Sequence, residues 1–351
     1  MIKQLLKRCI FQLLAFFIIG FALTVNPLSV YAQMMLQDEH LPFIPREFYI
    51  KEVTDERAGK SILTQGINFQ SSAAVTISNF ITRNLSKDKS LRPICISLKE
   101  LKLTEISLPD DRISGTLTFK CAFGLEKPYG TTHLIDYEGK SQYTRSKTND
   151  AVTEKSFRTQ VRASLNYFNT WITVNAPSSR KLASRVKVSF SDYTTQLEGD
   201  TIYYAANRPL TWTDFQAHIK PTTKYQAIVM PGIAYDQEAA INNGTIEVQI
   251  TLKAFLPKSA SWASAAVRDA YSLNHEQRHF DLAKITANQL QKQIMGQKLT
   301  PDNFEAVINM QYLDTLRELN TLQNSYDNET SHGTNTTAQS AWNAKIDRLL
   351  N

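Results

Sequence analysis

Two histidines and a glutamate stand in a spacing that can hold a metal ion. His275, Glu276 and His279 form the pattern His-Glu-x-x-His. Residues four positions apart lie on the same face of an α-helix, so both imidazoles can reach one Zn²⁺ ion. Zinc lowers the pKa of a water bound to it to about 7, and a neighbouring carboxylate can then accept the proton. The pattern therefore predicts an activated water with Glu276 as the general base, which is chemistry suited to hydrolysing an amide bond.

The residues around this pattern favour a helix that turns the pair toward the interior. The stretch 263–296 consists mostly of helix-forming residues, contains no proline and has its single glycine at the end. His275 and His279 continue a stripe of apolar or small residues, namely Val267, Tyr271, Leu282, Thr286 and Leu290. Two buried imidazoles without partners would be costly, so a metal site is favoured over a structural histidine pair.

A catalytic zinc ion needs a third protein ligand if its fourth position is to remain open for water. His332 is the leading candidate because it lies in the polar stretch 326–333, which ends in a glycine. We expect this stretch to be a loop that folds back over the metal. Asp327 is the competing candidate, since a carboxylate also suits zinc. Three further candidates are His218, Glu305 and Glu318.

Three neighbouring features have two interpretations each. The hydroxyl of Tyr326 can stabilise the oxyanion of a tetrahedral intermediate, or it can pack the loop. Asp327, if it is not a ligand, can orient His332. The expected strand at 245–255 can offer a free edge to an extended peptide, or it can lie in the middle of the sheet.

The first 32 residues are typical of an export signal. Basic residues at Lys3, Lys7 and Arg8 precede an apolar run at 9–25, and Ala32 supplies a small residue before cleavage at Gln33. An uncleaved anchor is the alternative, but the apolar run is shorter than the roughly 20 residues that a membrane span needs. We therefore expect a protein exported to the periplasm or secreted, with no stable membrane span after cleavage.

The charge balance argues against a nucleic-acid partner. The formal net charge of the whole sequence is +6. The signal carries three basic residues and no acidic one, so the remainder has a net charge of +3 (6 − 3). No block of lysine and arginine stands out, and we expect neither DNA nor RNA to bind.

The order of the expected elements predicts an α+β fold with two domains. A β-rich N-terminal domain of unknown role occupies 33–178, and a metallohydrolase domain occupies 179–351. In the first domain, strands are expected at 94–106, 113–119 and 131–143, followed by a helix at 150–171. In the second, strands at 186–190, 201–205, 227–230 and 245–255 precede the metal helix and two helices at 301–323 and 338–350.

Two cysteines remain after the signal. Cys95 and Cys121 lie in expected strands of the N-terminal domain. An oxidising compartment permits a disulfide between adjacent strands, and the alternative is a pair of buried free thiols. The sequence leaves both alternatives open.

The C-terminal half resembles a bacterial family of uncharacterised domains regarded as secreted zinc-dependent proteases. Three ordered motifs carry the resemblance: Arg-Pro-Leu-Thr-Trp-Thr-Asp-Phe at 208–215, His-Glu-Gln-Arg-His-Phe-Asp at 275–281, and Tyr-Asp-x-x-Thr-x-His-Gly at 326–333. The pair Gln339 and Trp342 is also similar. The resemblance covers about 197–351 and implies a zincin-like domain with an antiparallel-rich sheet. It implies the two helix histidines and His332 as metal ligands and Glu276 as the catalytic base.

The leading hypothesis is an exported, zinc-dependent metallopeptidase that acts on a peptide or protein substrate. One alternative is a non-catalytic module, stabilised by zinc, that binds a cell-envelope partner. Another is a zinc amidase acting on cell-wall material. Glu276 favours an enzyme, because a structural zinc site has no use for a base beside its ligand. The sequence does not indicate the oligomeric state.

Overall fold

The computed structural model describes residues 33–58, 68–69, 71–194, 198–218 and 225–350. The expected export signal at 1–32 lies outside these residues. The chain divides into two compact units, Met1–Asn169 and Thr170–Asn351. The division falls inside helix α3 (Ala151–Asn175), a few residues before the boundary expected at 178. Among the described helices, none is long and apolar enough to cross a bilayer.

The N-terminal unit is built on a sheet of four strands in the order β2-β4-β5-β6. Their bounds are β2 (Phe48–Asp55), β4 (Arg92–Ser107), β5 (Arg112–Lys127) and β6 (Gly130–Ser146). The three long strands pair antiparallel, as their alternating sequences predict, and β2 runs parallel to β4. Both connecting turns use residues with positive φ, which the turn signals around Asp111 and Gly130 predict.

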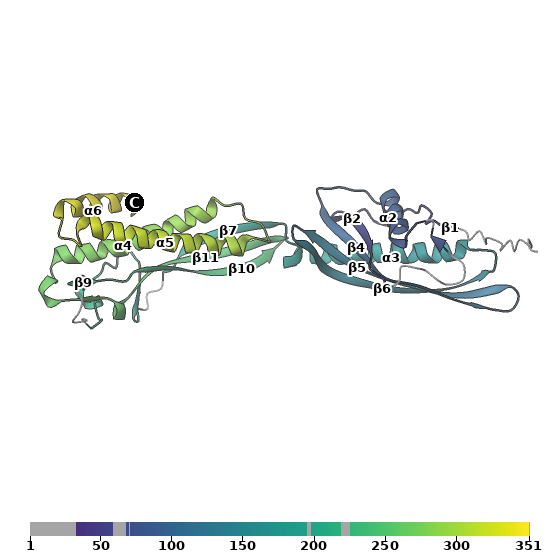
Figure 1. Ribbon diagram of the computed structural model, residues 1–351, viewed down its shortest axis with the longest axis horizontal. Coiled ribbons are helices and arrows are strands. Elements are labelled where there is room, and N and C mark those ends of the chain that lie inside the picture. Colours follow the sequence, from purple (N-terminus) through teal and green to yellow (C-terminus); the bar gives the residue numbers. More distant parts are fainter. Residues whose placement is uncertain (1–32, 59–67, 70, 195–197, 219–224, 351) are drawn as a thin grey trace, which may run out of the picture. The chain divides into compact units, whose positions relative to one another are not determined.

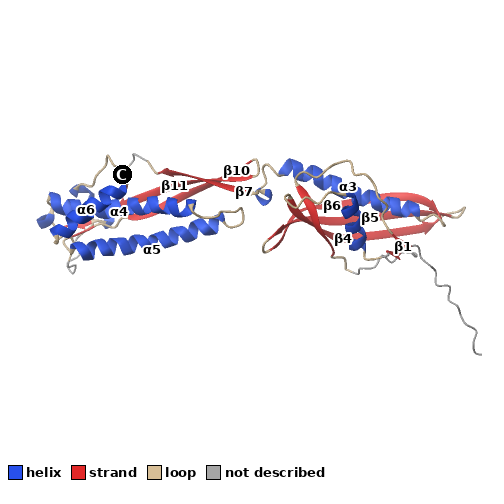
Figure 2. Ribbon diagram, turned by 90° about the horizontal axis from the view of Figure 1, so that it is seen from above, coloured by secondary structure: helices blue, strands red, loops and turns tan. Residues whose placement is uncertain are grey.

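Helices cover the apolar face of this sheet (Figures 1 and 2). Besides α3, the unit contains α2 (Ala73–Asn84) and the short parallel pair of β1 (Gln33–Met34) with β3 (Asn68–Phe69). Phe168 on α3 stacks on Phe123 of the sheet at 4.3 Å and meets Phe48 edge-on at 4.9 Å. The unit therefore buries these three aromatic rings between one long helix and the sheet.

The two cysteines do not form a disulfide. Cys121 pairs directly with Leu98, so these two residues share one face of the sheet. Cys95 is three positions from Leu98 on the same strand, and successive side chains alternate between faces. Cys95 and Cys121 consequently point to opposite faces, and both are free thiols.

The C-terminal unit is built on a second sheet. Its strands are β7 (Arg185–Asp192), β8 (Thr201–Tyr203), β10 (Gly232–Asn242) and β11 (Thr245–Pro257). β10 and β11 form an antiparallel hairpin whose turn uses positive φ at Asn243 and Gly244. β7 and β8 pair along the other side of β11. Since β11 is paired on both sides, it is a central strand and offers no free edge to a peptide. A separate pair joins β9 (Ala227–Ile228) to β12 (Trp262–Ala263).

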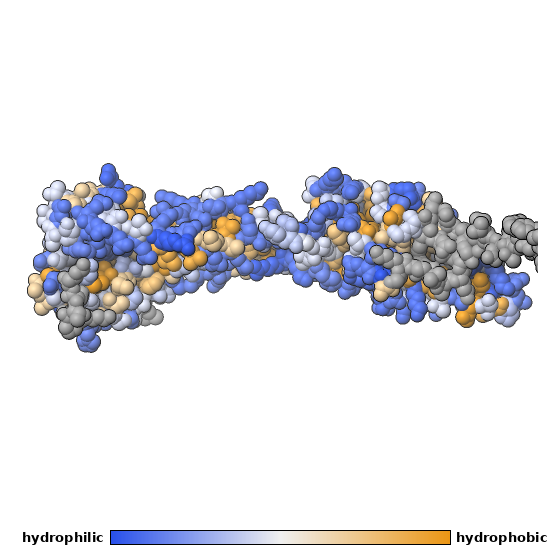
Figure 3. Space-filling model, in the orientation of Figure 1, coloured by the Kyte–Doolittle hydropathy of each residue, from blue (hydrophilic) through white to orange (hydrophobic). Residues whose placement is uncertain are grey.

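Three helices complete this unit: α4 (Ala270–Met295), α5 (Phe304–Thr330) and α6 (Thr336–Leu350). Asp269 caps α4 by accepting a hydrogen bond from the Ser272 N–H at 2.7 Å. Leu290 and Ile294 of α4 pack with Val248 and Ile250 of β11 in one core cluster. Figures 1 and 2 show α4 and α5 running along the sheet, and Figure 3 shows a mostly hydrophilic surface on the visible side. The architecture is α+β, as predicted, with a β-rich N-terminal part and C-terminal helices.

The stretch 326–333 differs from the expected loop. Helix α5 continues to Thr330, so Tyr326 and Asp327 lie on its last turns. The reason is burial: Tyr326 is fully buried, one heptad after the buried Leu319, and extends the apolar stripe of the helix.

Candidate metal centre

His275, His279 and Asp327 converge from two helices. Both histidines are buried on α4, and Asp327 faces them from α5. Asp327 Oδ1 lies 3.3 Å from His275 Nε2 and 3.0 Å from His279 Nε2. One donor atom from each of the three residues lies within 4.8 Å of the other two. This spacing suits three ligands of one cation.

The oxygen at the centre of this group lacks a hydrogen bond. Asp327 Oδ1 is buried and has no hydrogen-bond partner of good geometry, although the Nε2 atoms of both imidazoles lie within 3.3 Å of it. A buried carboxylate oxygen without a partner is costly, and such atoms are rare in folded proteins. A divalent cation held by the two imidazoles would satisfy this oxygen. The residues present therefore fit a zinc ion, for which two histidines and one carboxylate are a common ligand set.

The Nδ1 atoms of both rings meet the side-chain oxygen of a glutamine. His275 Nδ1 lies 2.9 Å from Gln339 Oε1 on α6. His279 Nδ1 is hydrogen-bonded to Gln323 Oε1 on α5. Three helices thus hold the two rings, with the Nε2 atoms directed at Asp327. Gln339 belongs to a motif that we noted in the sequence, but no local signal singles out Gln323.

Glu276 is buried beside the two histidines, with 5% of its surface exposed. Burial raises the pKa of its carboxyl, and the nearby imidazoles oppose this increase. A carboxyl group with a raised pKa is a better acceptor for a proton at neutral pH. Glu276 is therefore placed next to the candidate ligands in the environment that a general base requires.

Tyr326 packs against the rings of the two candidate histidine ligands. Its ring stacks on His275 at 4.8 Å. Its hydroxyl donates to the backbone oxygen of His275 at 3.2 Å and accepts from Gln339 Nε2 at 2.7 Å. Burial raises the pKa of this hydroxyl far above its ordinary value. These contacts favour the packing interpretation over the oxyanion role.

His332 lies next to the three-residue group of His275, His279 and Asp327 but is not part of it. Its Nδ1 atom lies 3.6 Å from Asp327 Oδ1, and 47% of its side chain is exposed. The ring contacts that of Tyr225 at 4.9 Å. Asp327, the alternative in the sequence analysis, is therefore the better placed third ligand, because α5 extends far enough to carry it into the site.

The other acidic and histidine candidates lie elsewhere. Glu305 pairs with Arg180 at 2.6 Å, and Glu318 accepts hydrogen bonds from glutamines of α4. His218 is exposed and is not in the three-donor group. Asp281 is buried, and it accepts a hydrogen bond from Tyr204 at 3.1 Å.

The motif at 208–215 contacts helix α4. Asp214 is buried, and each of its carboxylate oxygens accepts a hydrogen bond from the Arg208 guanidinium, at 2.8 and 3.1 Å. Asp214 and Thr211 close a capping box around the short 3₁₀ helix η2 (Trp212–Asp214). The Leu210 N–H then donates to Gln277 Oε1 on α4 at 2.7 Å. The loop thus docks directly on the helix that carries the histidines.

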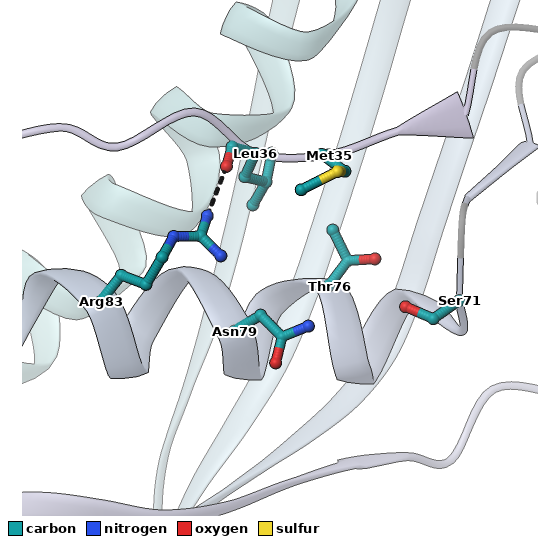
Figure 4. A pocket seen from close by; sticks show the side chains of 6 residues that line it. All are labelled: Met35, Leu36, Ser71, Thr76, Asn79 and Arg83. Atoms are coloured by element: carbon teal, nitrogen blue, oxygen red, sulfur yellow. Dashed lines mark hydrogen bonds between the residues drawn. The ribbon is translucent and has the colours of Figure 1, made fainter.

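A small pocket lies in the N-terminal unit between α2 and the segment that follows β1 (Figure 4). Among the described residues that line it, Arg83 is the only charged one, and its guanidinium donates to the Leu36 carbonyl at 2.7 Å. Arg83 also pairs with Asp38 at 2.5 Å. The pocket therefore contains no group of side chains suited to catalysis or metal binding.

Residues 207–333 match a family described as bacterial protein of unknown function, DUF922. The match spans the 208–215 loop, both histidines of α4 and His332, and it ends before Gln339. It confirms the expected resemblance to a bacterial family of uncharacterised domains. No curated protein matches the chain.

Two solved structures share a distant likeness with the chain. The first is protein XCC0632 from Xanthomonas campestris, of family-model DUF330. It has 8% identity and a TM-score of 0.28, over 40% of this chain and 93% of that one. The second is a minor lipoprotein from Acinetobacter baumannii, with 13% identity and a TM-score of 0.21, over 35% of this chain and 92% of that one. Both likenesses are too distant to indicate a function.

Proposed function

We propose that the C-terminal unit is a zinc-dependent metallopeptidase with a zincin-like site. His275, His279 and Asp327 hold the ion, and Glu276 acts as the general base. The observation that carries the proposal is Asp327 Oδ1, which is buried without a hydrogen bond and lies 3.0–3.3 Å from two imidazole nitrogens. A bound zinc ion supplies Lewis acidity, which lowers the pKa of water and polarises a carbonyl group.

The side chains of the protein have separate tasks in this proposal. Gln323 and Gln339 hold the two imidazoles, and Tyr326 supports the ring of His275. Glu276 accepts a proton from the attacking water and passes it to the leaving amine. A purely structural zinc site has no use for a base beside its ligands, so the buried Glu276 favours a catalytic role.

The proposed substrate is a peptide or protein outside the cytoplasm. The basic and apolar pattern of residues 1–32 supports export to the periplasm or the medium. A cell-wall amide and a purely structural zinc site are the alternatives that the experiment must separate.

The test compares the wild-type protein with Glu276→Gln and His275→Ala. Bound zinc is measured by metal analysis, and turnover is measured on casein and on peptidoglycan. We expect one zinc ion in the wild type and casein cleavage that Glu276→Gln reduces by about 10²- to 10⁴-fold with zinc retained. His275→Ala should lose the zinc. A wild-type protein that stays metal-free in excess zinc would overturn the proposal. Zinc binding with turnover of peptidoglycan alone would identify an amidase, and zinc binding with no turnover would support the structural module.

A further inference from the structure

We propose that Gln323 and Gln339 are positioning residues that fix the tautomers of the two candidate metal ligands. Gln339 belongs to α6, so we also infer that metal binding and the docking of this last helix stabilise each other. The inference rests on the proposed function and adds to it the residues that prepare the site for the ion.

The orientation of the Gln339 amide is fixed by its other contacts. Its Nε2 group donates to the Tyr326 hydroxyl at 2.7 Å and to Asn343 Oδ1 at 2.9 Å. The Oε1 atom is therefore the one that faces His275 Nδ1 at 2.9 Å. Since an amide oxygen only accepts, Nδ1 of His275 must carry the proton. In the neutral ring the lone pair is then on Nε2, the atom directed at Asp327.

Gln323 fixes the second ring through two contacts. Its Nε2 group donates to the backbone oxygen of His279 at 2.9 Å, which sets the direction of the amide. Its Oε1 atom accepts a hydrogen bond from Nδ1 of the same histidine. His279 therefore has the same tautomer as His275. In the neutral form of each ring, Nε2 is the atom that can bind a cation.

The hydrogen-bond partners of both imidazoles are neutral amides, whereas many zinc-binding histidines donate to a carboxylate. A carboxylate partner would make the imidazole a stronger donor and add a negative charge. Glu276 and Asp327 already bring two carboxyl groups to this small buried volume. An amide side chain fixes the orientation of the ring without adding a third carboxyl group. Because a carboxylate partner adds a negative charge and makes the imidazole a stronger donor, Gln339→Glu should strengthen zinc binding.

Helix α6 reaches the site through one continuous set of contacts. Trp342 and Ile346 pack with Leu282, Ile285 and Tyr326 in a buried cluster. The rings of Tyr326 and Trp342 lie 5.4 Å apart, and Tyr326 stacks on His275. Docking of α6 thus brings Gln339 to His275. If docking of α6 increases the affinity of the site for the metal ion, the bound ion must stabilise the docked helix by the same free energy.

The test uses Gln323→Met and Gln339→Met, which keep the side-chain length but remove the acceptor. Gln289→Met is the matched control, because Gln289 is an exposed glutamine of α4 that donates to Glu318 at 3.1 Å. The dissociation constant for Zn²⁺ is measured by competition with a chelator, and folding of the metal-free proteins is followed by circular dichroism. We expect each of the two variants to weaken zinc binding about 10- to 100-fold. The control should bind as the wild type does.

Two further measurements separate positioning from loss of folding. Gln339→Glu retains an acceptor for His275, and it should bind zinc at least as tightly as the wild type. In hydrogen exchange, zinc should slow the exchange of α6 amides in the wild type and protect them less in Gln339→Met. If wild type binds zinc and the folded methionine variants bind it equally well, the inference is wrong and the proposed function stands. If wild type binds no zinc, the proposed function itself fails.

Discussion

Gly333 lies against the ring of His275. A Cβ atom at Gly333 would stand 3.2 Å from His275 Cγ, and the residue has a φ of +82°. Ser331 and His332, which precede it, also have positive φ, so α5 ends in three left-handed residues beside the candidate metal centre. The tight turn needs a glycine at this point both for its backbone and for the space that the imidazole occupies.

Gly333→Ala should therefore destabilise the protein. The added methyl group meets the His275 ring, and the left-handed backbone disfavours alanine, so we expect a loss of about 1–3 kcal/mol in the free energy of unfolding. Chemical denaturation measures this loss. Gly296→Ala is the control, because Gly296 has a φ of −76° and a Cβ there would meet only ordinary contacts at 3.5 Å. That change should be neutral or stabilise by about 0.4–1 kcal/mol.

The third ligand can be identified by comparing Asp327→Ala with His332→Ala. Asp327 Oδ1 lies between the two helix histidines, whereas His332 stands outside them. We expect Asp327→Ala to weaken zinc binding much more than His332→Ala, as measured by chelator competition. The reverse order would assign His332 as the third ligand, which is the candidate that the sequence favours.

Removing the metal should lower the stability of the C-terminal unit. A ligand that binds only the folded state stabilises it by about 2.7 kcal/mol when its free concentration is 100 times its dissociation constant. Thermal unfolding with and without EDTA should show this difference in the wild type. His275→Ala should unfold at the same temperature under both conditions. An equal EDTA effect in that variant would show that the chelator acts elsewhere.

The N-terminal unit contains a buried ion pair that provides an independent prediction. Arg145 donates to both oxygens of Glu105, at 2.9 and 3.0 Å, and both residues are buried. Arg145→Met removes the cation that pairs with the buried Glu105 carboxylate and should destabilise the unit by about 3–5 kcal/mol. Lys147→Met removes an exposed pair with Asp111 and should change stability by less than about 1 kcal/mol. Urea denaturation followed by circular dichroism compares the two.

The same ion pair predicts sensitivity to acid. Burial would raise the pKa of Glu105, but hydrogen bonds from Arg145 and Tyr143 outweigh burial and hold the pKa below its ordinary value. The unfolded state therefore binds the proton more readily. The stabilisation that this ion pair provides is fully present above the ordinary glutamate pKa of about 4.3. It is lost as the pH falls through the lower pKa that Glu105 has in the folded state. Denaturation at pH 7 and pH 3 should show a larger difference in wild type than in Glu105→Leu/Arg145→Met.

The sequence by itself determined the features that depend on local periodicity. The four-residue spacing of His275 and His279 placed both rings on one face of a helix, and α4 confirms this arrangement. Alternation of apolar residues predicted the long strands of the N-terminal unit, and turn residues such as Asp111 and Gly130 marked their ends. These features follow from neighbours along the chain, so a single sequence contains them.

Only the tertiary structure decided which distant residues meet. Asp327 reaches the histidines because α5 is one helix up to Thr330, and the burial of Tyr326 rather than local propensity extends it that far. Likewise, the pairing of β5 with β4 separates Cys95 from Cys121 by the thickness of the sheet. Contacts of this kind depend on helix packing and strand register, and these are set by the whole core rather than by the local pattern of residues.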